Sequence, residues 1–112
     1  GDNPLVVWGD GSQIRDFIHA EDAARGILIV AEKGAGQIVN IGSGKGLSIR
    51  RLAELVALNT GNPKLVFDTS KPSGDAIRIM KTGRAQALGF EPKISIEEGV
   101  KKTIEWYESS KV

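Results

Sequence analysis

The spacing of apolar residues changes several times in the first third of the chain, and each change predicts a new element. The short run Leu5–Trp8 has the β-rich composition of a strand and ends at the turn-forming triplet Gly9–Gly11. Extended character returns from Ile14 to Ile18. From Glu21 to Lys33 apolar residues recur at helical spacing, with acidic residues early and a lysine last to complement the helix dipole. The pattern therefore predicts a strand, an extended segment and a helix, in that order.

The same alternation of periods continues to the C-terminus. After a stop at Gly34–Gly36, the run Gln37–Gly42 predicts a mostly buried strand. Ser48 can cap a helix with apolar residues at core spacing, and Gly61 supplies a left-handed stop. The other predicted elements are a strand at Lys64–Thr69, an extended segment at Ala76–Met80, a short helix from Thr82 to Gly89, and a closing helix introduced by the capping-box pair Ser95 and Glu98.

Strands that alternate with helices make the fold class α/β. Three or so short strands are fewer than an open parallel sheet normally contains, so we expect a small incomplete sheet with about four helices. The 112 residues, 40% of them apolar, can furnish one modest core, and no repeat or long linker divides them. Residues 1–112 are therefore expected to form a single domain.

Composition excludes several classes of function. A formal charge of +1 and only six aromatic residues argue against a nucleic-acid surface. With no cysteine and one histidine, a metal site is not expected. The longest apolar run, Ile27–Ala31, is far too short to span a membrane, which favours a soluble, cytoplasmic protein. The chain begins Gly1–Pro4 without methionine, which suggests that it was excised from something longer.

Two arginines are the strongest candidate ligands. Arg15 follows the Gly9–Gly11 turn, and Arg78 follows a second glycine turn that also carries Asp75. A guanidinium group suits a phosphate, and a diphosphate needs donors on both phosphates, so two arginines 63 residues apart could converge on one. Asp75 could accept hydrogen bonds from sugar hydroxyls. Trp8 could form one wall of a pocket for a base or a sugar. The alternatives are surface ion pairs of Arg15 with Asp10 or Asp16, an ordinary exposed turn around Asp75, and a core role for Trp8.

Three further motifs are better explained by structure than by chemistry. The turn Gly42–Gly46 precedes a helix and could hold an anion, but it lacks the Walker pattern and favours a plain turn. His19 at a helix entrance is more typical of a residue that fixes the backbone than of a proton-transfer group. Tyr107 and Lys111 have the Tyr-x-x-x-Lys spacing of short-chain dehydrogenases, yet they end a terminal helix with no cofactor fold before it. No Gly-x-Gly-x-x-Gly follows a strand, so no cofactor-binding residue is expected here.

Four ordered blocks together resemble the extended short-chain dehydrogenases, the NAD-dependent epimerase/dehydratase family, and most of all its GDP-L-fucose synthase branch. The blocks are Val6–Gly11, Arg15–Asp22, Asn40–Gly44 and Phe67–Pro72, and the likeness runs on through Leu88–Phe90 and Ile94–Gly99.

The resemblance implies the C-terminal, nucleotide-sugar-binding portion of an NAD(P)-dependent epimerase, dehydratase or reductase. Trp8 would shape the substrate pocket, Arg15 and Arg78 would hold the diphosphate, and Asp75 would face the sugar or ribose hydroxyls. NAD or NADP and the catalytic residues would belong to an N-terminal Rossmann domain absent from this chain, which would be inactive alone. Lys81 and Gly83 depart from the family pattern and leave the substrate open.

The family also implies that the stretch from Glu21 to Gly42 folds against the N-terminal sheet. Without that cover we expect its apolar face to self-associate into a homo-oligomer or to be locally disordered. A rival interpretation is a non-catalytic α/β structural or protein-interaction domain, which fold alone does not exclude.

Overall fold

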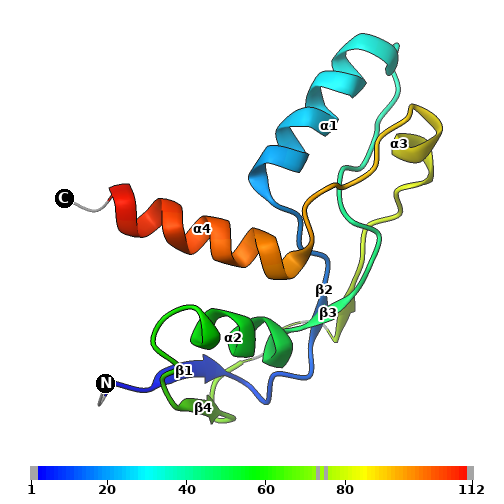
Figure 1. The fold of residues 1–112 in the computed structure, drawn as a ribbon. Coiled ribbons are helices and arrows are strands. Elements are labelled where there is room, and N and C mark those ends of the chain that lie inside the picture. Colours follow the sequence, from blue (N-terminus) through cyan, green and yellow to red (C-terminus); the bar gives the residue numbers. More distant parts are fainter. Residues whose placement is uncertain (1–2, 73, 75, 111–112) are drawn as a thin grey trace.

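The computed structural model describes residues 3–72, 74 and 76–110. In these residues it contains four helices and five short strands in the order β1–β2–α1–β3–α2–β4–β5–α3–α4 (Figure 1). The strands are β1 (Leu5–Trp8), β2 (Ile14–Arg15), β3 (Leu47–Ser48), β4 (Leu65–Asp68) and β5 (Ile77–Arg78). The helices are α1 (Ala20–Lys33), α2 (Ile49–Leu58), α3 (Gly83–Ala87) and α4 (Ile96–Ser110). The expected α/β class and the number of helices are confirmed.

The strands form two separate small sheets. β1 and β4 pair in parallel from Leu5 opposite Leu65 to Trp8 opposite Asp68. β2 lies at the centre of the other sheet, antiparallel to β3 and parallel to β5. The expectation of one incomplete sheet is thus refined to two small ones.

Helix ends follow the capping chemistry of the sequence. The His19 side chain accepts a hydrogen bond from the Glu21 amide at the start of α1. Ser48 accepts from the Arg51 amide at the start of α2, and Ser95 accepts from the Glu98 amide at the start of α4. Each satisfies an amide that the first helical turn leaves without an internal partner.

The predicted strand Gln37–Gly42 is wrong, because these residues are irregular. No described strand runs beside them, and Ile38 is 83% exposed. An apolar run forms a strand only where a neighbouring strand can take up its amides and carbonyls. The extended segment Ile14–Ile18 is likewise a strand only at Ile14–Arg15.

Gly61 has the predicted left-handed backbone, with φ +83°, but it lies beyond the end of α2. The helix itself ends at Leu58, with Asn59 as the C-cap residue. The predicted stop is therefore part of the turn that follows the helix.

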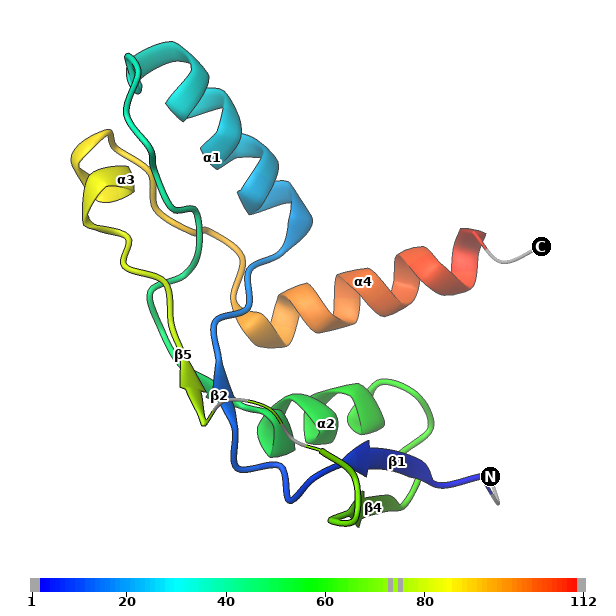
Figure 2. The same cartoon turned by 180° about the vertical axis from the view of Figure 1, so that it is seen from behind.

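The chain folds into two parts rather than one sphere. α2 packs against β1, β4 and α4, and its Ala53, Leu55 and Ala57 are buried. At the other end lie α1 and α3 (Figures 1 and 2). Phe90 is buried there, and both Phe90 and Ile41 lie against Gly26 of α1. We call residues 20–42 and 82–92 the arm and the rest of the chain the body. The radius of gyration is 16.3 Å, whereas a compact domain of this length has about 13 Å.

The arm exposes apolar side chains. Ile27 and Leu28 on α1 are 62% and 68% exposed. Within the described part of the chain, no helix has both the length and the apolar character of a membrane span.

Candidate functional site

The two candidate arginines lie side by side in the structure. In the parallel pair β2–β5, Arg15 is directly opposite Arg78, and Ile14 is opposite Ile77. Neighbouring strands are about 4.8 Å apart, and residues in register project to the same face. Folding thus brings together two side chains that are 63 residues apart in the sequence.

Arg15 has no carboxylate partner among the described residues. Its Nη1 donates a hydrogen bond of 2.8 Å to the Ile14 carbonyl. The side chain is half-buried and its Nη2 lies against Gly74, so that a Cβ at that glycine would sit 3.4 Å from Nη2. The alternative ion pairs with Asp10 and Asp16 do not form, and these aspartates instead accept hydrogen bonds from Ser12 and from Gly44.

Trp8 is a surface residue, which excludes the core interpretation. Its side chain is 58% exposed at the end of β1, and the Lys71 ammonium lies 5.5 Å from the ring centroid. An exposed indole beside a cation can stack on a flat base or sugar face while the cation approaches a phosphate.

A polar pocket of about 260 Å³ is lined by residues next to Trp8 and Arg15, although neither of these two side chains lines it. Lys71 lines one side of it, next to the Trp8 ring, and Gly74 lines the other, next to Arg15. Its remaining lining residues are Gly9, Asp10, Ser12, Gln13, Thr69 and Ala76. Asp75, the fourth candidate, lies outside the described residues, and Arg78 is exposed at the surface.

The first turn of α2 fixes one wall of this pocket. The amides of Ile49 and Arg50 donate to the carbonyls of Gln13 and Gly11, each at 2.9 Å. The Arg50 guanidinium also lies 4.0 Å from the centroid of the Phe67 ring. Gly11 must be glycine, because its φ is +79° and a Cβ there would lie 2.7 Å from the Phe67 ring.

Residues 1–42 match the model of the NAD dependent epimerase/dehydratase family. Over 105 residues the chain is 42% identical to a putative GDP-L-fucose synthase of Arabidopsis thaliana, a match that covers 92% of this chain and 32% of the plant protein. It is 33% identical to the GDP-L-fucose synthase of Escherichia coli over 92% of this chain and 36% of that enzyme. The chain is therefore similar to members of the NAD-dependent epimerase/dehydratase family.

Solved structures of that family have the same fold. A Thermotoga maritima UDP-glucose 4-epimerase, crystallised with UDP-glucose, superposes with a TM-score of 0.82 at 32% identity, over 97% of this chain and 36% of the epimerase. An epimerase of Methanothermobacter thermautotrophicus gives a TM-score of 0.86 at 28% identity, over 96% of this chain and 34% of the other. The chain thus spans about a third of the length of the family members it matches.

The described residues do not fit the dinucleotide that the family name implies. β1 leads through Gly9–Gly11 to β2 rather than to a helix. The other glycine turn, Gly42–Gly46, is already filled: the Asp16 carboxylate accepts hydrogen bonds of 2.8 Å from the amides of Ser43 and Gly44. A phosphate-binding loop needs such amides free, so the interpretation as a plain turn is confirmed.

The structure describes one of the other two cautionary motifs in full and only half of the second. His19 Nδ1 accepts a hydrogen bond of 3.1 Å from the Glu21 amide. The side chain therefore fixes the start of α1, as expected. Tyr107 is 57% exposed on α4, and Lys111 lies outside the described residues.

Sequence reasoning missed the roles of two aspartates. Asp22 is 2% exposed and accepts hydrogen bonds from the amides of Lys93 and Ile94 and from Arg25. Burial raises the pKa of Asp22, but these hydrogen bonds outweigh it and hold the pKa below its usual value. Asp16 behaves in the same way: burial raises its pKa, and hydrogen bonds led by those from Ser43 lower it further than burial raises it. Apart from Arg25, which is three residues from Asp22, none of these partners is near in sequence.

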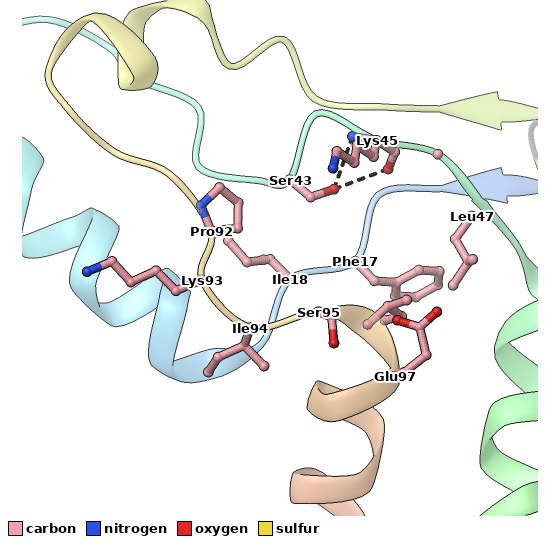
Figure 3. A pocket seen from close by; sticks show the side chains of 12 residues that line it. Phe17, Ile18, Ser43, Lys45, Leu47, Pro92, Lys93, Ile94, Ser95 and Glu97 are labelled. Atoms are coloured by element: carbon pink, nitrogen blue, oxygen red, sulfur yellow. Dashed lines mark hydrogen bonds between the residues drawn. The ribbon is translucent and has the colours of Figure 1, made fainter.

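A larger pocket, of about 470 Å³, opens between the Ser43–Leu47 segment and the start of α4 (Figure 3). Phe17, Ile94 and Leu47 supply apolar lining. Inside it the Ser43 hydroxyl is hydrogen-bonded to the Lys45 backbone at 3.0 and 3.2 Å. Neither Arg15 nor Arg78 lines this pocket. The smaller pocket is the better candidate for an anion, because its lining residue Gly74 lies against Arg15 Nη2 and its lining residue Lys71 carries a positive charge.

Proposed function

We propose that this chain supplies the nucleotide-sugar-binding part of an NAD(P)-dependent sugar-nucleotide epimerase, dehydratase or reductase. The observation that carries the proposal is the registered pair Arg15 and Arg78 on β2 and β5. Two adjacent guanidinium groups can each take one phosphate of a diphosphate, which a single arginine cannot do as well. GDP-L-fucose synthases and UDP-glucose 4-epimerase among the matched proteins support a nucleoside-diphosphate sugar as ligand.

The roles of the individual residues follow from their chemistry and from their neighbours. Arg15 and Arg78 hold the diphosphate, and Trp8 with Lys71 forms a flat wall for the base or sugar. The Asp75 carboxylate accepts hydrogen bonds from hydroxyl groups of the ribose or sugar. The chain's own contribution to the reaction is thus to bind the substrate and orient it.

The chemical step belongs to residues outside this chain. In this proposal the chain is the C-terminal portion of the enzyme, an N-terminal Rossmann domain carries NAD or NADP with the catalytic groups, and the chain alone is inactive. The cofactor would exchange a hydride with the sugar: it would accept and return one in an epimerase or dehydratase, and donate one in a reductase. The 112-residue protein, assayed with a nucleotide sugar and added NAD(P), is expected to show no turnover.

Titration of the ¹⁵N-labelled chain with GDP and with UDP tests the binding role. The expected result is chemical-shift changes confined to Trp8, the Gly9–Gln13 turn and the two arginine strands. Arg15→Ala should weaken binding by about 1.5–3 kcal/mol, the scale of a hydrogen bond to a charged group. Arg51→Ala is the matched control, because Arg51 is an exposed arginine on α2 whose partner is Glu54 at 3.5 Å. Equal affinities of the Arg15→Ala and wild-type chains would remove Arg15 from the site.

The exposed face of α1 favours a second candidate function, a structural or protein-interaction domain. Ile27 and Leu28 are well exposed there, which is unusual for an isolated domain. The same titration separates the two candidates, since an interaction domain would show scattered surface shifts with no preference for a diphosphate.

A further inference from the structure

β5 is too short and too exposed to hold its own register. It consists of Ile77 and Arg78 alone, and Ile77 is 66% exposed. Ile79 and Met80, which follow, are 43% and 44% exposed. Little apolar surface is buried here, and strands with weak burial are prone to slip. A slip of one residue would turn Arg78 to the opposite face from Arg15.

One carboxylate ties the end of β5 to the rest of the fold. Asp16 Oδ1 accepts hydrogen bonds from the Ser43 amide and hydroxyl at 2.8 and 2.6 Å. Its Oδ2 accepts from the amides of Gly44 and Met80 at 2.8 and 3.2 Å. Three segments that are distant in sequence therefore meet on the residue that directly follows Arg15.

These contacts bracket the arginine pair. On one side the Ile14 amide donates to the Ala76 carbonyl at 2.8 Å. On the other side the Met80 amide, two residues beyond Arg78, is held by Asp16. With both flanks fixed, β5 cannot shift along β2.

The segments that meet at Asp16 are packed so closely that the neighbouring turn has no room for a side chain at Gly42. A Cβ at Gly42 would lie 2.8 Å from Met80 Cβ and 3.0 Å from Asp16 Oδ2. Real Cβ atoms do not approach other atoms this closely without displacing them, so the backbone of the turn is packed directly on the carboxylate.

We propose that Asp16 is a positioning residue that holds Arg78 in register with Arg15, so that both guanidinium groups address the same diphosphate. This inference rests on the proposed function for its ligand but not for its geometry. Asp16 touches no ligand itself and acts through the backbone of Met80.

Asp16→Asn tests the geometry directly. The asparagine oxygen can keep both Ser43 contacts, while its amide nitrogen would face the Gly44 and Met80 amides and repel them. Cross-strand nuclear Overhauser effects between Arg15 and Arg78 should weaken in this variant. Met80 is a half-exposed residue. In the wild type its backbone amide should nevertheless exchange with solvent more slowly than an unstructured amide. Fast exchange at Met80, or Overhauser effects unchanged by Asp16→Asn, would overturn the proposal even if the variant were poorly folded.

Asp22→Asn is the matched control for general destabilisation. It also removes a carboxylate that accepts several amides, but its partners are Lys93, Ile94 and Arg25 rather than the arginine strands. It should lower stability and leave the Arg15–Arg78 Overhauser effects in place. Loss of those effects in both variants would mean that any destabilisation frees β5, and would refute a specific role for Asp16.

Binding supplies the functional readout. Asp16→Asn should lower the affinity for GDP about tenfold, the effect of one lost charge-assisted hydrogen bond, and leave the weaker affinity for GMP nearly unchanged. In an Arg78→Ala background Asp16→Asn should add nothing, because the residue that it positions is gone. Additive losses would overturn the proposal. If the wild type bound neither GDP nor UDP, the proposed function would fail, and the Overhauser and exchange measurements would still decide the role of Asp16.

Discussion

Replacing Asp22 by alanine should cost a large share of the stability of this chain. The carboxylate is 2% exposed and accepts hydrogen bonds of 2.9 and 3.0 Å at Oδ2 from the amides of Ile94 and Lys93. Arg25 adds a charged contact of 2.7 Å. Each hydrogen bond to a charged group contributes about 1.5–3 kcal/mol, and a buried donor left without an acceptor costs about 1–3 kcal/mol.

Partial access of water to Arg25 and Lys93 reduces this sum. The Arg25 side chain is 31% exposed, so its pair with Asp22 is discounted for solvent screening. We expect Asp22→Ala to lower the free energy of unfolding by about 2–4 kcal/mol, out of the roughly 5–15 kcal/mol that is typical of folded domains. Urea denaturation followed by circular dichroism at pH 7 measures this difference.

The pH dependence gives a sharper test. The folded pKa of Asp22 is lowered, so its ionised form adds stability that is fully present above the unfolded value of about 3.9 and is lost as pH falls through the folded pKa. The gap between wild type and Asp22→Ala should therefore stay constant from pH 7 to about pH 4 and shrink below it. A loss under about 0.5 kcal/mol at pH 7, the usual effect of a neutral surface substitution, or a gap that does not change on acidification, would refute the reasoning.

Three other substitutions probe the turn beside the pocket, a helix cap and the arm. Gly11→Ala should destabilise the chain by at least about 1 kcal/mol in thermal melts, because its φ is +79° and the new Cβ would meet the Phe67 ring; an unchanged melting temperature would contradict this. Ser48→Ala should cost about 1 kcal/mol through loss of the α2 cap, which urea titration would detect, with Ser48→Asp expected to restore most of it. Ile27→Lys together with Leu28→Glu should shift any self-association measured by sedimentation velocity toward monomer, and an oligomer that survives both changes would show that this face of α1 is not the contact.

The helices were predictable because their signals are local. α1, α2 and α4 each combine apolar residues at helical spacing with a capping side chain within three residues of the helix start. The strands β1 and β4 were also foreseen, since each is a short β-rich run bounded by turn residues. In these elements the residues that decide the conformation are neighbours in sequence.

The failures concern contacts between distant residues. Gln37–Gly42 has the composition of a buried strand, but whether a strand forms depends on a neighbour that the described chain does not offer. Spacing suggested that Arg15 and Arg78 might share a ligand, yet only the pairing of β2 with β5 sets them side by side. Asp16 was not foreseen at all, because its partners lie 27, 28 and 64 residues away.

The division into arm and body has a consequence for how the chain breaks down. The arm has its own small core around Phe90 and joins the body through extended segments (Figure 2) and through the polar contacts of Asp22 with Lys93 and Ile94. It can come apart while α2, β1 and β4 stay folded, so a protease should cleave near Lys33 or Arg84 long before it reaches α2. The surviving piece would retain the Gly9–Gln13 turn and the hydrogen bonds that its Gly11 and Gln13 carbonyls accept from the first turn of α2.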